Sequence, residues 1–255
     1  MATIKVRSRR GSASRTTGAV TLLNDHLHDP TVPAPAAVHD ALARDADGTP
    51  LAYRAGTATF LGVELLVDEG ALVPRAETEL LGHGALERLR DLSADGGGLV
   101  VIDLCCGCGN LACGLAAALA GLRVHAADLT DGCVSLSRRN AVHVGVADRV
   151  EVHQGDLFGA LEHTGIAGRV DLIVANPPYI SSGRLEKDRA VLVSHEPREA
   201  FDGGPYGLSI HQRLINEAPL WLRPGGWLLC EMGMGQGKQV RRLFDRAGAY
   251  DAVSF

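Results

Sequence analysis

The chain has 255 residues, of which 46% are hydrophobic and 22% charged, and its formal net charge is −5 at pH 7. These values are typical of a globular protein and exclude a low-complexity or fibrous chain. At this length about 70–75% of the unfolded surface is buried on folding, so we expect one large domain with an appendage. The longest apolar run, residues 111–122, is too short to span a bilayer. No apolar run follows the basic N-terminus, as a secretory signal would require.

Charge is distributed unevenly along the chain. Residues 1–15 contain no acid and carry the basic side chains Lys5, Arg7, Arg9, Arg10 and Arg15. The remainder is acidic, which disfavours binding to a long phosphate backbone. We therefore expect the basic arm to be a solvated tail, with contact to nucleic acid as the less favoured alternative. The six cysteines indicate reduced thiols and a cytoplasmic protein.

Turn-forming residues predict three regions. Residues 1–47 read as a basic arm, unstructured over 1–17, followed by short helices at about 18–28 and 35–45. Residues 48–75 read as a linker that contains a β-hairpin around Gly62. Residues 76–255 read as the main domain.

The main domain alternates between apolar strands and helices. Strands are predicted at 99–104, 123–127, 150–153, 171–175, 226–232 and 251–255. Helices are predicted at 76–91, 110–120, 131–144, 208–222 and 236–247. This alternation predicts an α/β fold of the Rossmann-like kind, a mostly parallel twisted sheet with helices on both faces.

A glycine-containing loop follows the first of these strands. Gly107 and Gly109 allow the backbone to turn tightly and to approach a ligand closely. Asp128 ends the next strand, where an acid accepts hydrogen bonds from ribose hydroxyls. An adenosine-bearing cofactor is expected there. The loop alone leaves its identity open, because residues 107–112 also satisfy a nicotinamide-binding pattern.

The fourth strand runs into the segment Asn-Pro-Pro-Tyr at 176–179. Each proline lacks an N–H and holds the preceding residue extended, so the strand ends in a stiff tip. That tip offers a side-chain amide, unpaired carbonyls and an aromatic ring. Open parallel sheets bind ligands at the carboxyl ends of their strands, so we expect the tip to face the glycine loop.

With this tip, the sequence resembles the class I S-adenosylmethionine methyltransferases. Within that class, Asn-Pro-Pro-Tyr is found in enzymes that methylate nitrogen on planar groups, either base amines or the glutamine amide. Further stretches resemble the protein-glutamine methyltransferases of the HemK/PrmC family over residues 48–255. These stretches are 72–81, the hairpin residues Tyr53, Gly56, Phe60 and Gly62, then 155–158, 195–204, 207–208, Glu231, Gly233 and Gln236.

The resemblance implies S-adenosylmethionine as the cofactor and assigns residues to three roles. The cofactor-binding residues are Asp103, Cys105, Cys106, Gly107, Cys108, Gly109, Asp128, Asp156, Leu157 and Asn176. The catalytic residues are Asn176, Pro177, Pro178 and Tyr179. The substrate-binding residues are Arg75, Thr78, Tyr179 and His195. No metal site is expected, since the clustered cysteines read as small buried thiols.

The chemistry of the tip follows from its groups. An amide nitrogen is a weak nucleophile, and positioning it against an electrophilic methyl group supplies much of the rate. We expect the Asn176 side-chain oxygen and the Pro177 carbonyl to accept the two N–H groups of the substrate. Tyr179 is expected to stack on the planar group, and no general base is needed before transfer.

Three departures from the family bear on substrate and assembly. Only about 47 residues precede the hairpin, whereas the family carries a longer helical bundle that docks the release factor. Cys105 and Cys106 replace the usual Gly-Thr. The family's last strand, inserted antiparallel into the sheet, has no counterpart after residue 255. The sheet is therefore expected to have a raw edge through which a homo-oligomer could form.

Two acceptors remain open within methyl transfer. The favoured one is a glutamine of a protein, such as the Gly-Gly-Gln loop of a peptide chain release factor. The alternative is a small molecule, either a free amino acid or a biosynthetic intermediate with an amide or guanidine nitrogen. A cofactor-binding module without catalysis and a nucleic-acid base methyltransferase are less favoured.

Overall fold

The computed structural model describes residues 2–8, 49–93, 98–187 and 196–255. The helices expected at 18–28 and 35–45, and His195, lie outside the described residues. Within the described residues no helix is both long and apolar enough to cross a membrane.

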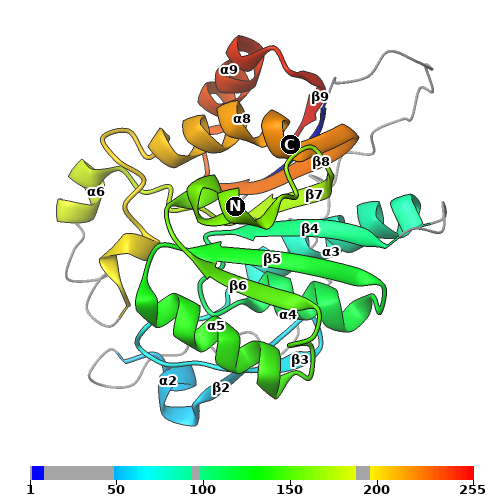
Figure 1. Cartoon of the computed structure of the whole chain (residues 1–255). Helices are drawn as coiled ribbons and strands as arrows, with labels where there is room; N and C mark the ends of the chain where they lie inside the picture. Colours follow the sequence, from blue (N-terminus) through cyan, green and yellow to red (C-terminus); the bar gives the residue numbers. More distant parts are fainter. Residues whose placement is uncertain (1, 9–48, 94–97, 188–195) are drawn as a thin grey trace, which may run out of the picture.

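Seven strands form one sheet in the order β6-β5-β4-β7-β8-β1-β9 (Figure 1). The five central parallel strands are β4 (Leu99–Leu104), β5 (Leu122–Asp128), β6 (Val150–Gln154), β7 (Val170–Ala175) and β8 (Leu222–Met232). The chain moves outward from β4 to β6 and then returns to the other side of β4 with β7. This reversal creates a crevice at the carboxyl ends of β4 and β7, which is where open α/β sheets bind ligands.

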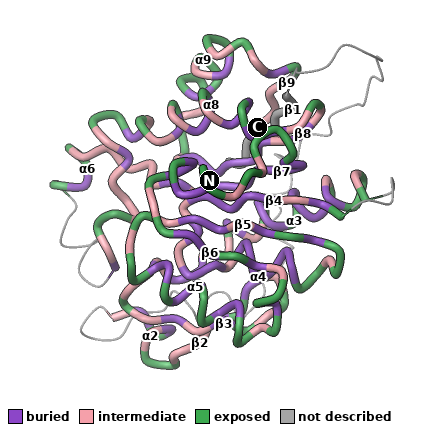
Figure 2. Tube along the Cα trace, viewed as in Figure 1, coloured by how far each residue is buried: buried purple, intermediate pink, exposed green. Residues whose placement is uncertain are grey.

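Helices cover both faces of the sheet, as Figure 1 shows, and the fold class is confirmed. One face packs against α3 (Ala76–Ser93), α4 (Asn110–Ala118) and α5 (Asp131–His143). The other face packs against the 3₁₀ segment η1 (Leu157–Thr164), α8 (Ser209–Trp221) and α9 (Gly237–Ala247). Successive strand residues point to opposite faces of the sheet. Val101 packs in the core under α3, α4 and α5, and Ile102 packs in the core under η1, α8 and α9. The central strands are accordingly buried almost throughout (Figure 2).

The predicted hairpin is present as β2 (Thr57–Phe60) and β3 (Val63–Leu66), paired antiparallel after the short helix α2 (Leu51–Ala55). Its turn residue Leu61 fits against two helices. A Cβ at Gly82 in α3 or at Gly114 in α4 would approach the Leu61 side chain to within 2.7 Å or 2.9 Å. The two glycines therefore let the hairpin dock closely on the main domain.

The N-terminal strand β1 (Ala2–Ser8) lies antiparallel between β8 and β9 (Tyr250–Ser254). The expectation of an unstructured segment is wrong for these seven residues. The raw edge is also wrong, because β1 pairs with β8 from Ala2↔Met232 to Arg7↔Trp227. Exposed edge groups need hydrogen-bond partners, and β1 supplies them to β8. The reason for expecting a homo-oligomer through this edge is thereby removed.

Four short helical segments were not predicted: α2, η1, α6 (Ser182–Lys187) and η2 (Arg198–Ala200). None of them is long enough for the repeated apolar pattern that indicates an amphipathic helix. Strand β8 also begins at Leu222, four residues before its expected start.

Candidate active site

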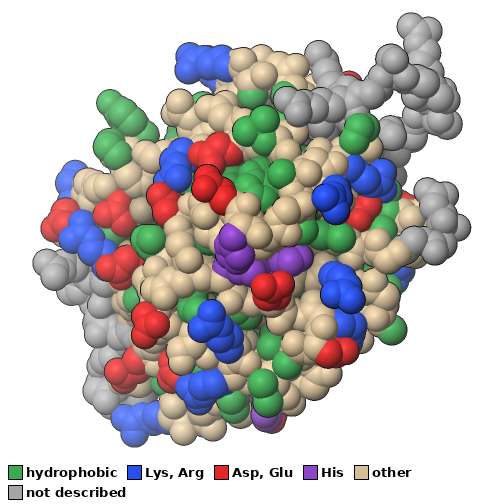
Figure 3. All heavy atoms as spheres, viewed as in Figure 1, with side chains coloured by type: hydrophobic (Ala, Val, Ile, Leu, Met, Phe, Trp, Pro, Cys, Tyr) green, Lys and Arg blue, Asp and Glu red, His purple; other side chains and the backbone are tan. Residues whose placement is uncertain are grey.

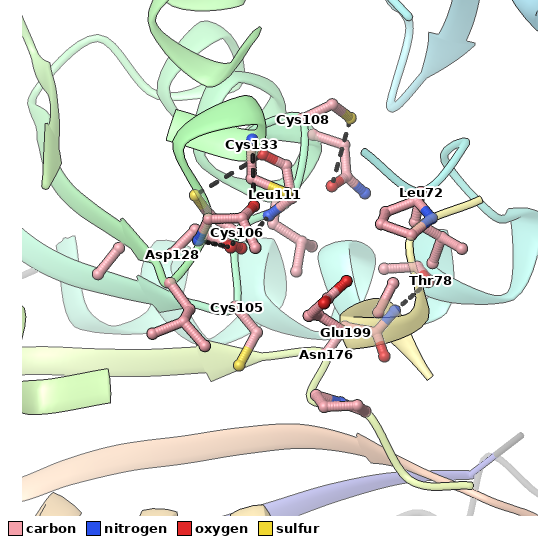
Figure 4. Close-up of a pocket in the computed structure, with 18 of the residues that line it drawn as sticks. Leu72, Thr78, Cys105, Cys106, Cys108, Leu111, Asp128, Cys133, Asn176 and Glu199 are labelled. Carbon is pink, nitrogen blue, oxygen red and sulfur yellow. Dashed lines mark hydrogen bonds between the residues drawn. The ribbon is translucent and has the colours of Figure 1, made fainter. Parts of the chain in front are cut away.

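A cavity opens at the carboxyl ends of the parallel strands, on the crevice between β4 and β7. Its wall combines the loops after β4, β5, β6 and β7 with the entry to α3 and the segment around η2 (Figure 4). The lining residues are Leu72, Val73, Pro74, Arg75, Thr78, Cys105, Cys106, Gly107, Cys108, Asn110, Leu111, Ala127, Asp128, Leu129, Thr130, Cys133, Gly155, Asp156, Leu157, Asn176, Pro178, Pro197, Glu199, Ala200 and Ile210.

The loop after β4 is shaped by left-handed backbone. Gly107 and Gly109 have φ of 55° and 79°, and Cys105 adopts 57° despite its side chain. Such a conformation at a non-glycine residue costs about 1–3 kcal/mol and is concentrated at functional sites. A Cβ at Gly107 would meet nothing within 4 Å. The missing side chain therefore leaves room at the wall of the cavity.

Asp128 holds this loop from the end of β5. Its Oδ2 accepts a hydrogen bond from the Gly107 N–H at 2.9 Å, and its Oδ1 accepts one from the Thr130 N–H at 3.2 Å. Thr130 Oγ1 also donates to Oδ1 at 3.5 Å. A carboxylate has about four acceptor positions, so capacity remains for a ribose hydroxyl. The open face at Gly107 and the acceptor capacity of Asp128 fit the S-adenosylmethionine that the resemblance implies.

The segment after β6 forms another part of the wall. Leu157 lines the cavity with a left-handed φ of 50°. Asp156 also borders the cavity, but both of its carboxylate oxygens accept from Arg213 Nη1 at 2.9 Å. Arg213 on α8 therefore holds this turn against the second face of the sheet.

Asn176 ends a chain of hydrogen bonds that starts at a buried acid. Thr78 Oγ1 donates to Glu231 Oε2 at 2.8 Å, and Asn176 Nδ2 donates to Thr78 Oγ1 at 3.0 Å. An ionised carboxylate only accepts, so Glu231 fixes the direction of both bonds when it is ionised. The amide nitrogen of Asn176 is then engaged, and its oxygen remains to accept from a ligand. Burial is the main cause that raises the pKa of Glu231 to about 7.

The proline tip is held by two neighbouring segments. Gln236 Nε2 donates to the Tyr179 carbonyl at 2.9 Å, and Gly203 donates to the Ile180 carbonyl at 2.8 Å. A Cβ at Gly207 would collide with the Tyr179 carbonyl, and the φ there is 68°. The close approach of the 203–207 loop thus requires glycine and fixes the backbone that follows Asn176.

Arg75 ties the entry of α3 to the segment after the tip. Its Nη2 donates to both oxygens of Glu196, at 2.8 Å and 2.7 Å, and the Glu196 side chain is 1% exposed. The Val73 N–H also donates to Glu196 at 3.2 Å. Charge-assisted hydrogen bonds of this length are among the stronger ones in proteins. It holds the cavity mouth in place.

The acid and the thiols near the cofactor loop are shifted towards their neutral forms. Burial raises the pKa of Asp103 to about 8, and its Oδ2 accepts from the Ala112 N–H at 3.0 Å. Burial also raises the pKa of the thiols of Cys105, Cys106 and Cys108, and that of Cys113 to about 12. These thiols are protonated at neutral pH and are poor nucleophiles. All six cysteines are free.

Most residues singled out in the sequence come together around this cavity. Its wall includes Arg75, Thr78, Cys105, Cys106, Gly107, Cys108, Asp128, Asp156, Leu157, Asn176 and Pro178. Asp103, Gly109, Pro177 and Tyr179 are close in sequence to lining residues but are not themselves part of the wall. Tyr179 interacts instead with Glu231, and burial raises its pKa.

Sequence reasoning missed three acids at the site. Glu231 orients Thr78, Glu196 binds Arg75, and Glu199 lines the cavity beside Thr78 and Asn176 (Figure 4). All three belong to stretches that resemble the family. Their positions in these family-like stretches could have pointed to them. The neighbouring sequence, however, did not indicate which side chain each acid would contact.

Comparisons with known proteins agree with this geometry. Residues 86–200 match the family described as "Methyltransferase small domain". The chain is 38% identical over 219 residues to the release factor glutamine methyltransferase of Geobacter sulfurreducens, covering 86% of this chain and 73% of that protein. It is 35% identical over 204 residues to the protein of the same name from Synechocystis, covering 80% and 68%.

Among solved structures, a methyltransferase from Pyrococcus furiosus shares the fold with a TM-score of 0.52 at 18% identity, covering 73% of this chain and 79% of that one. The sequence relatives are 38% and 35% identical to this chain and are covered over 73% and 68% of their length, which shows the family. This chain belongs to the release factor glutamine methyltransferases.

Proposed function

We propose that this chain transfers a methyl group from S-adenosylmethionine to the side-chain amide nitrogen of a glutamine in a peptide chain release factor. Relatives that carry this activity in their names align with 79–86% of the chain, taking Bacillus cereus and Geobacter sulfurreducens as examples. A small-molecule acceptor is not favoured by any of these relatives. When bound, S-adenosylmethionine supplies an electrophilic methyl group.

The observation that carries the proposal is the orientation of Asn176. The bonds from Asn176 to Thr78 and from Thr78 to Glu231 turn the amide oxygen of Asn176 towards an incoming donor. A primary amide nitrogen brings two N–H groups. The Asn176 oxygen and the Pro177 carbonyl would accept one each, which would leave the nitrogen lone pair free to attack a methyl donor.

These acceptors favour the transition state over the bound substrate. As the new N–C bond forms and the methyl–sulfur bond breaks, positive charge develops on nitrogen, and its N–H groups become stronger donors. One of these protons is lost to solvent after the transfer, which leaves a neutral N-methyl amide. Fixed acceptors that gain strength as charge develops lower the barrier without reorganising. Tyr179, with its backbone held by Gln236, would have to turn from Glu231 to close over the planar amide.

The lining of the cavity supports the cofactor roles. Asp128 would accept from the ribose, Leu157 would pack on the adenine, and the loop 105–108 would border the methionine portion. Asp103 does not line the cavity. It accepts a hydrogen bond from the Ala112 N–H and so holds the first turn of α4 against the loop. Arg75 and Thr78 flank the acceptor entrance. We place the reaction in the cytoplasm, with the release factor as partner.

Label transfer from S-adenosylmethionine tests the proposal. The protein is incubated with a release factor, with the same factor lacking its Gly-Gly-Gln glutamine, and with a metabolite extract. Mass spectrometry then locates the label. We expect one methyl group on the glutamine side chain and none on the altered factor. Label found only in small molecules would overturn the assignment of a protein acceptor.

A further inference from the structure

Three histidines and one glutamate gather on the face of the sheet that carries η1. His125 lies on β5, Glu151 and His153 lie on β6, and His163 lies in the last turn of η1. Figure 3 shows histidine side chains together near the centre of this face, with an acidic side chain beside them. None of the four residues lines the cofactor cavity.

The strand register brings three of these side chains to one point. His125 is the parallel partner of Glu151, and His153 is two residues further along β6. Residues two apart on a strand share a face, so all three side chains project to the same side. His125 Nδ1 is 3.3 Å from His153 Nε2, and the Glu151 oxygens are 3.6 Å and 3.7 Å from these two nitrogens.

Hydrogen bonding accounts for only part of this arrangement. A single proton serves the 3.3 Å contact between the two rings, and the contacts to Glu151 are longer than hydrogen bonds. The carboxylate thus converges on the two nitrogens without a hydrogen bond to either ring.

The spacing of the two ring nitrogens matches tetrahedral coordination, and the Glu151 oxygens, at 3.6 Å and 3.7 Å from them, are slightly further away. Zinc binds imidazole nitrogen at about 2.0–2.1 Å, and ligands at that distance with tetrahedral angles lie about 3.3 Å apart. The measured separation of the two ring nitrogens is 3.3 Å. Ligand atoms of all three residues lie within 4.8 Å of one another.

The charges around the group also bear on a bound cation, and Glu151 would attract it. Arg123 and Arg138 oppose a cation through their charge. Arg138 directs one nitrogen to the Val152 carbonyl at 2.8 Å.

We propose that His125, Glu151 and His153 bind a zinc ion, with water in the fourth position. Two imidazoles and one carboxylate suit zinc among the common divalent metals, whereas magnesium and calcium prefer oxygen alone. The ion links β6, the outermost strand on this side of the sheet, to β5. It acts on folding stability and lies apart from methyl transfer.

Metal titration of the chelator-treated full chain tests the site. We expect one equivalent of zinc to compete with a chromophoric chelator, and the melting temperature to rise by about 5–10 °C at a hundredfold excess over the dissociation constant. Cobalt should give visible bands of four-coordinate geometry without a thiolate charge-transfer band. That band would instead place the metal on the free cysteines and overturn the proposal.

Three variants complete the test. H125A/H153A removes both ring nitrogens. E151Q removes only the carboxylate charge, and because the Glu151 side chain is 64% exposed, we expect this variant to fold like the parent chain. The matched control is H143A, because His143 faces Glu64 at 3.2 Å with no second histidine in that pair. We expect binding to be lost in the double variant, weakened at least tenfold in E151Q and unchanged in H143A. Equal binding by E151Q and the parent chain would contradict the site.

Discussion

The hydroxyl of Thr78 lies between Glu231 and Asn176. Ionised Glu231 can only accept a hydrogen bond, and the amide nitrogen of Asn176 can only donate one. At the scale of single residues, the ionised buried acid therefore sets the orientation of the Asn176 amide through this hydroxyl. Protonated Glu231 would itself become a donor, and Thr78 could then turn its hydroxyl towards Asn176. The ionised acid is therefore the form that supports the proposed reaction.

Glu231 should also make folding stability depend on pH. Its pKa is raised from 4.5 to about 7 in the folded state. The protonated form is thus favoured by folding, and its stabilising effect is complete below pH 4.5 and lost as pH rises to about 7. Glutamine does not titrate, so E231Q should not lose this stability. Between pH 4.5 and about 7, the free energy of unfolding of E231Q minus that of the parent chain should increase by about 3 kcal/mol, measured by urea titration. Asp103 shifts in the same direction in both proteins and cancels from the difference.

Methyl transfer should show the opposite pH dependence. The rate of the parent chain should rise with the ionisation of Glu231 near pH 7, while E231Q should lack that step. An unchanged pH–rate profile in E231Q would remove Glu231 from the account.

T78V keeps the shape of the side chain and removes its hydroxyl. Asn176 Nδ2 then loses its acceptor, and we expect the single-turnover rate to fall about tenfold or more, as misplacement at a reacting centre does. Cofactor affinity, measured by calorimetry, should stay within about twofold. A rate equal to that of the parent chain would show that the Asn176 orientation does not depend on Thr78.

At the scale of elements, the proline tip depends on the loop that packs against it. G207A would place a Cβ against the Tyr179 carbonyl and force a left-handed φ of 68° on alanine. We expect a loss of about 1–3 kcal/mol in stability, read by thermal unfolding, and a larger loss of activity, because the tip shifts. The matched control is G183A in α6, where a Cβ meets nothing within 4 Å. Similar behaviour of both variants would argue against the packing role of Gly207.

At the scale of the whole molecule, β1 joins the first residues of the chain to the last strand. Val6 pairs with Leu228 of β8 and with Val253 of β9. Proline at this position removes an N–H from the middle of a ladder, so V6P should lower the melting temperature and promote association through the opened edge. Ala2 pairs with Met232 at the end of the strand, and A2P is the control. Light scattering and thermal unfolding distinguish the two. Equal effects would contradict a structural role for β1.

The sequence predicted the parallel sheet well because each central strand is a continuous apolar run with a helix behind it. Three features escaped it for a common reason. The β1–β8 ladder, the Thr78–Glu231 bond and the Arg75–Glu196 pair join segments that are far apart in the chain; the second of these spans 153 residues. Local periodicity carries no information on such partners. Strand β1 was further concealed by its basic residues, which suggested a tail.

The most direct test of the central claim is the rate of methyl transfer to the release-factor glutamine by N176A under single-turnover conditions. Removing an oriented group that stabilises developing charge typically costs about 10²–10³ in rate. We predict a loss of this size with cofactor affinity changed by no more than about twofold. A variant that methylates the glutamine at the parental rate would contradict the account, because the acceptor amide would then be positioned by other groups.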